Sequence, residues 1–115
     1  MELIREIVER IERYWAADVE IVGAWYDSET TGYLVYQRLI EPAVLLGRRL
    51  EFGEGAAGGT LESYVADVAV DLDEPLGAAA VEQDRYGIRW TAIAAGASVP
   101  QLPPDIAARL PTGHH

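Results

Sequence analysis

The sequence predicts an α+β domain in which two amphipathic helices pack on an antiparallel sheet. Apolar residues recur at helical spacing near the N-terminus and again after residue 60, and three β-rich segments with short links lie between these regions. A further β-rich segment follows the second helix. Strands joined by short links pair most simply as an antiparallel meander. Both helices are then expected on one face of the sheet, with a helix on each face as the alternative.

The N-terminal segment is expected to form the first helix. Its charged face carries Glu6–Arg10 and Glu9–Arg13, both in the favourable i,i+4 order. Each pair contributes only about 0.2–0.5 kcal/mol, so burial of the apolar stripe must hold the helix. The stripe consists of Leu3, Ile4, Ile7, Val8, Ile11, Tyr14 and Trp15.

Three strands are expected next, over 19–26, 33–40 and 43–52, with a polar turn between the first two. In the first strand, alternation places Glu20 on the face opposite Ile21 and Trp25. The residues expected to share a face of that strand are Val19, Ile21, Gly23 and Trp25. Those expected on one side of the third strand are Val44, Leu46, Arg48, Leu50 and Phe52.

A glycine-rich connection over 53–59 precedes the second helix, for which Thr60 is the expected N-cap and Pro75 and Gly77 the stop signals. The apolar stripe of this helix is Leu61, Tyr64, Val65, Val68, Ala69 and Leu72. A loop over 78–86, a short strand over 88–93 and a Pro-containing tail follow. The tail is expected to hold one helical turn at 105–110, with Pro104 at its first position. We therefore expect a single domain over 1–113, loop-rich from 94 to 113, and a tag remnant at 114–115.

Composition excludes several classes of function. The chain has nine arginines, no lysine, no cysteine and 19 acidic residues, which gives a net charge of −10. Such a charge disfavours binding to nucleic acid or to an anionic membrane surface. The lack of cysteine excludes disulfides, Cys-zinc sites and thiol catalysis. No apolar run of membrane-spanning length is present, so we expect no membrane association and a cytoplasmic location.

Motifs for catalysis or cofactor binding are missing. The terminal pair His114 and His115 are the only histidines, so the serines have no histidine base. The segment 53–59 lacks the Lys-Ser/Thr end of a phosphate-binding loop, and Asp71-Leu72-Asp73 lacks the spacing of a calcium loop. We expect no cofactor or metal, and an enzyme is less expected than a binding protein. A pair of carboxylates acting as general acid and base stays open, with Glu20 as its first candidate.

Acidic residues of the second helix predict a surface for a basic protein partner. Asp67 and Asp71 lie four residues apart, and Glu74 would join them one turn later. We expect Asp67 and Asp71 on the exposed side, where their charge would steer a basic partner toward the helix. The alternative is the solvated face of an acidic protein.

Aromatic residues on the second strand bear on self-association. Tyr33 and Tyr36 lie at opposite parities, so aromatic groups occur on both faces of the predicted sheet. Either both faces are covered or one of them is a partner surface or a dimer interface. We expect a homodimer formed through the sheet.

The order helix, three strands, helix, strand, together with the acidity of the chain, resembles the small bacterial secretion chaperones and equally the toxin-neutralising immunity proteins. This resemblance of coarse architecture implies a non-catalytic protein that binds another protein. The leading hypothesis is therefore a small acidic protein-binding module. The first alternative is a small-molecule-binding domain or carboxylate-based enzyme, with a pocket between sheet and helices near Glu20, Trp25 and Trp90. The second alternative is a structural subunit of a larger assembly.

Overall fold

The elements of the fold follow the predicted order. A computed structural model describes residues 3–41, 43–52, 59–73, 80–83, 86–91 and 100–110. In chain order these form α1 (Leu3–Tyr14), β1 (Val19–Tyr26), β2 (Thr31–Arg38), β3 (Leu45–Glu51), α2 (Leu61–Asp73), β4 (Ala80–Gln83), β5 (Arg89–Thr91) and α3 (Pro104–Ala107). The predicted α+β class is confirmed, including the three-stranded meander, the second helix, the further strand and the helical turn in the Pro-containing tail.

One five-stranded sheet has the order β1-β2-β3-β5-β4. Strands β1, β2 and β3 are antiparallel, whereas β5 pairs parallel with β3, since both α2 and β4 lie between them in the chain and β4 runs opposite to β5. Strand β4 pairs antiparallel with β5 and lies where a loop was predicted, so that part of the prediction was wrong. Pairing with β5 specifies this four-residue strand, which has no alternating apolar pattern of its own.

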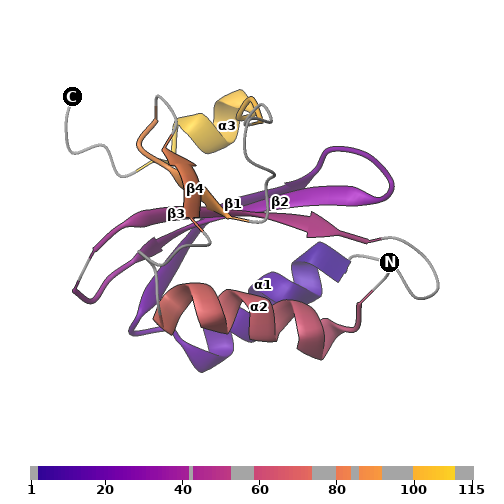
Figure 1. Cartoon of the computed structure of the whole chain (residues 1–115), viewed down its shortest axis with the longest axis horizontal. Helices are drawn as coiled ribbons and strands as arrows, with labels where there is room; N and C mark the ends of the chain where they lie inside the picture. Colours follow the sequence, from indigo (N-terminus) through magenta and orange to yellow (C-terminus); the bar gives the residue numbers. More distant parts are fainter. Residues whose placement is uncertain are drawn as a thin grey trace.

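Helices cover both faces of the sheet (Figure 1). As predicted, α1 and α2 lie together on one face, where Ile4, Ile7 and Ile11 of α1 pack with Val68 and the sheet. The short α3 lies on the opposite face and contributes to a second core. That core consists of Val22, Tyr33, Val35, Ile88, Trp90, Leu102 and Ile106.

A β-bulge changes which side chains of β1 face the helices. The pairing with β2 shifts between Ile21 and Gly23. Val19 and Ile21 pack in the α1–α2 core, whereas Trp25 packs in the α3 core. A Cβ on Gly23 would lie 2.7 Å from Cγ1 of Ile106 in α3. The predicted common face was therefore wrong beyond Ile21, because one extra residue reverses the alternation.

Other local predictions are confirmed by contacts. On β3, Leu46 and Leu50 belong to the α1–α2 core, and Val44 and Phe52 pack against it. At the start of α2, Thr60 Oγ1 accepts a hydrogen bond from the Ser63 N–H at 3.2 Å, and Ser63 Oγ accepts one from the Thr60 N–H at 2.9 Å. This reciprocal pair is an N-cap.

One predicted core residue is exposed, and other predictions concern residues that the structure does not describe. Tyr14 was predicted in the buried stripe of α1, but it is 58% exposed at the last residue of the helix. The glycine-rich connection at 53–58, residues 92–99 of the predicted strand and tail, and the terminal histidines lie outside the described residues. None of the helices in the described part of the chain has the length and apolarity that a membrane span needs.

Candidate functional site

The interface between α2 and the sheet contains a buried ion pair. Asp71 of α2 is only 3% exposed. Arg48 of β3 donates from Nε to Asp71 Oδ2 at 2.6 Å and from Nη2 to Asp71 Oδ1 at 2.8 Å. This two-pronged geometry is the strongest form of carboxylate–guanidinium contact, and it uses both oxygens of the carboxylate.

Two hydroxyl groups complete the surroundings of Asp71. The Tyr36 hydroxyl of β2 donates to Asp71 Oδ2 at 2.8 Å, and Thr91 Oγ1 of β5 lies 3.3 Å from the same oxygen. Thr91 Oγ1 also contacts the Gly47 carbonyl at 3.3 Å. One carboxylate on α2 therefore ties the helix to the three neighbouring strands β2, β3 and β5.

The charges and protonation states in this cluster suit a role in holding α2 on the sheet. Burial raises the pKa of Tyr36 well above its ordinary value of 10.0, and the negative charge of Asp71 acts in the same direction. Burial opposes the charge on Arg48, but the hydrogen bonds and the attraction of Asp71 outweigh it, so the pKa of Arg48 is raised. Tyr36 therefore keeps its proton at neutral pH and can donate it in the hydrogen bond to Asp71.

The predicted acidic partner surface does not form as expected. Asp67 is exposed, but the expectation that Asp71 is exposed was wrong. Asp71 follows Val68 by three residues and precedes Leu72, so its side chain lies on the buried face of α2. Glu74 lies outside the described residues.

The predicted partner surface on the sheet is also covered. Tyr33 and Tyr36 do lie on opposite faces, as their parity indicated, because each belongs to a different core. Both are buried, Tyr36 completely. Of the two possibilities left open by the sequence, the described residues show the first at these positions, because a core covers each of the two tyrosines.

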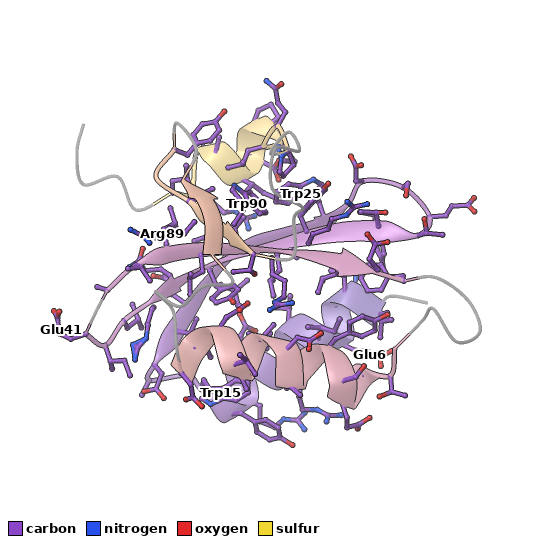
Figure 2. The ribbon with its side chains drawn as sticks, in the orientation of Figure 1. Glu6, Trp15, Trp25, Glu41, Arg89 and Trp90 are labelled. Atoms are coloured by element: carbon purple, nitrogen blue, oxygen red, sulfur yellow. The ribbon has the colours of Figure 1, made fainter. Side chains whose placement is uncertain are left out.

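The residues of the predicted pocket are only partly brought together. Trp25 and Trp90 lie on the α3 side of the sheet (Figure 2), each against the ring of Tyr33, with centroids 5.4 and 5.7 Å away. Trp90 is fully buried, so this region is packed core. Glu20 is exposed near the start of β1 and is not part of this cluster.

A surface groove follows the outer side of β1 and α1. Two adjoining hollows of about 520 and 350 Å³ share Glu12 and Ile21. We call the two together the edge groove. The helix side supplies Ile4, Arg5, Val8 and Glu12, the last three spaced three or four apart, and Ala16 of the turn after α1 continues this line. The strand side consists of residues 19–24, and Leu39 and Arg109 complete the lining at the two ends.

A second surface hollow lies at the other end of β1. It has a volume of about 420 Å³ and is separate from the edge groove, with which it shares no lining residue. Its lining residues, which define the aromatic pocket, are Leu3, Tyr26, Ser28, Glu29 and Phe52. Sequence reasoning missed both hollows, since they depend on which elements lie side by side. The only sequence signal for the edge groove is the spacing of its α1 residues.

Comparisons with known proteins add nothing to this geometry. No protein-family model, curated protein or solved structure matches the chain. Among the described residues, no three His, Cys, Asp or Glu side chains gather in a way that would hold a metal ion. The functional argument therefore rests on the surface of the molecule.

Proposed function

We propose that the chain is a protein-binding module whose edge groove takes up an extended segment of a partner protein, with a basic side chain of that segment beside Glu12 and Glu20. The observation that carries this proposal is the coincidence of a groove with the free edge of β1. Strand β1 stands at the end of the sheet order, and among the described strands it pairs with β2 alone.

An edge strand offers backbone groups to another chain. Alternate N–H and C=O groups on its outer side have no partner within the sheet, and an added strand can hydrogen-bond with them. In the edge groove, apolar Val8, Val19 and Ile21 lie beside that edge. Backbone pairing would supply affinity, and the half-buried Val8 and Ile21 would select the apolar residues of the added segment.

The geometry restricts docking to the first part of β1. The bulge follows Ile21, and Arg109 Nη1 lies 3.4 Å from the carbonyl oxygen of Val22, which it approaches as a donor. Both features hinder strand addition from Val22 onward. Of the first three residues of β1, Val19 already donates its N–H to the Trp15 carbonyl at 3.0 Å, which leaves the stretch from the Val19 carbonyl to Ile21 for pairing. Leu39 beside this stretch is 49% exposed.

The charges of the edge groove support a basic segment. Glu20 lines the hollow at the Leu39 end, Glu12 lines both hollows, and both carboxylates are exposed, while Arg5 and Arg109 line the other hollow. With a net charge of −10, the whole chain attracts cationic partners. Exposed rim charges of this kind mainly raise the association rate and fix the direction of the bound segment.

A displayed library of random peptides of about eight residues, within the usual length of a strand, tests the proposal without assuming a partner. Selection on the wild-type protein should enrich alternating β-branched residues with Lys or Arg near one end. Selection on Glu12→Arg/Glu20→Arg should enrich Asp or Glu at that position instead. Asp67→Arg/Asp73→Arg changes the net charge equally on exposed positions of α2 and should leave the wild-type preference unchanged.

Synthetic peptides then distinguish strand addition from non-specific attraction. The best selected peptide should lose at least tenfold in affinity when alternate residues on one edge are N-methylated, because each methyl group removes a backbone donor. An identical selection profile for both double variants would refute the proposal. Self-association of the chain that is abolished by Glu12→Arg/Glu20→Arg would refute the partner stated here, because the occupant would then be a second copy.

A further inference from the structure

We propose that the aromatic pocket binds a quaternary or methylated ammonium group. The pocket lies where the first residue of α1, the last residue of β1, the following turn and the end of β3 meet. Its volume of about 420 Å³ falls within the range of about 300–1,000 Å³ that is typical of small-ligand sites. This inference is independent of the proposed function, because the edge groove has other lining residues.

Two aromatic rings form walls of the aromatic pocket. The centroids of Tyr26 and Phe52 are 5.5 Å apart and the rings are tilted by 56°. Tyr26 is 40% exposed, which is unusual for a large aromatic residue of this chain and leaves part of its ring accessible to a ligand. Rings inclined to one another can contact a rounded cation from two sides, and the negative face of each ring attracts positive charge.

Contacts behind the pocket hold these rings in position. The Tyr26 hydroxyl accepts a hydrogen bond from the Ile4 N–H at 3.2 Å. Phe52 packs edge-on against Tyr64, with centroids 5.3 Å apart. The Tyr64 hydroxyl donates to the Glu51 carbonyl at 2.6 Å and accepts from the Gly59 N–H at 2.9 Å. The walls are therefore fixed before a ligand arrives, which lowers the entropic cost of binding.

The polar lining selects a cation. Glu29 supplies a carboxylate, Ser28 a hydroxyl, and none of the five lining residues is basic. A carboxylate beside aromatic faces repels anions and attracts cations. Leu3 adds an apolar wall, which suits the methyl groups of a quaternary ammonium better than a strongly hydrated primary ammonium. Carboxylate, aromatic rings and apolar wall together match a methylated ammonium.

Choline and its uncharged isostere 3,3-dimethylbutan-1-ol test the inference, because they have the same shape and differ in charge. We expect choline to bind about tenfold more tightly and to shift the NMR signals of the Tyr26 and Phe52 ring protons. A second arm with an N-acetyl trimethyllysine amide tells whether the natural source of the group is a small molecule or a modified side chain. Equal affinity for choline and the isostere, or no shift of either ring, would overturn the inference.

Substitutions locate the site. Glu29→Gln changes an exposed residue and should weaken choline several-fold while leaving the isostere unaffected. Phe52→Leu keeps apolar bulk but removes a ring, and should have the same effect. Tyr14→Leu removes an exposed ring outside the aromatic pocket and should change nothing. If Glu29→Gln and Tyr14→Leu affect choline alike, the aromatic pocket is not the site, whatever happens to Phe52→Leu.

Discussion

Replacing Asp71 by asparagine should lower the free energy of unfolding by about 3–5 kcal/mol. The side chain keeps its size, but it loses the charge that faces Arg48 and presents an amide N–H₂ to guanidinium donors. The two bonds from Arg48, at 2.6 and 2.8 Å, are charge-assisted and contribute about 1.5–3 kcal/mol each. The Arg48 side chain is only 14% exposed, so water restores little of the loss.

Urea denaturation followed by circular dichroism measures this effect. With a dependence of about 2 kcal/mol per molar urea, typical of a small domain, the midpoint should fall by about 2 M. Asp67→Asn is the matched control, because it makes the same chemical change one turn earlier on α2 at an exposed position. Its effect should stay within about 0.5 kcal/mol.

A double substitution separates charge from packing. Asp71→Leu with Arg48→Met replaces the pair by apolar groups, and such replacements are often neutral or stabilising. We expect the double variant to be more stable than Asp71→Leu alone, because no unpaired guanidinium stays buried. If Asp71→Asn and Asp67→Asn lose the same stability, the ion pair does not hold α2 to the sheet and the reasoning fails.

Three further predictions concern the core residue Ile7, the hydroxyl proton of Tyr36 and the contact between Gly47 and Trp90. Ile7→Ala should cost about 2–5 kcal/mol in urea denaturation, whereas Tyr14→Ala at the exposed end of the same helix should cost little. Because the pKa of Tyr36 is raised in the folded state, the unfolded chain loses this proton first as the pH rises past 10.0. The free energy of unfolding then falls by about 1.4 kcal/mol per pH unit until Tyr36 titrates in the folded state as well. Tyr36→Phe should lack this loss in urea midpoints measured at increasing pH, and equal slopes would contradict it. Gly47→Ala should lower the free energy of unfolding by about 1–3 kcal/mol, since its Cβ would lie 2.6 Å from the Trp90 ring. An unchanged near-ultraviolet spectrum and an unchanged urea midpoint would contradict this, because they would show that the ring moves aside without loss of stability.

Local patterns predicted those parts of the fold that local physics controls. The stripe of α1 is one example, because Ile4, Ile7 and Ile11 share a face through helical periodicity alone. The cap at Thr60 is another, since a side chain satisfies an amide three residues away. The bulge in β1 and the strand β4 depend on pairing with other strands, which leaves no periodic signal in the chain.

The ion pair could have been predicted, although the two halves of the signal lay apart in the sequence. Arg48 fell in the row of third-strand residues expected to face one way, where its neighbours Leu46 and Leu50 are apolar. An arginine that faces a core needs acceptors there, either a carboxylate or, as for the buried Arg38, backbone carbonyls. Asp71 lies three residues after Val68 and beside Leu72, within the apolar stripe of α2. Because Asp71 was grouped with Asp67 by its charge, its place on the buried face of α2 was not predicted.

The bulge in β1 shapes both surface hollows on which the two proposals rest. Before it, Val19 and Ile21 face the helices beside the open edge, and this part of the strand lines the edge groove. After it, alternation is reversed, so Tyr26 points to the helix side and its hydroxyl reaches the Ile4 N–H at the start of α1. In a strand without the extra residue, Tyr26 would lie on the α3 face and Trp25 would take its place against α1. The aromatic pocket therefore exists because of the same bulge that, in the proposed function, would limit strand addition to the beginning of β1.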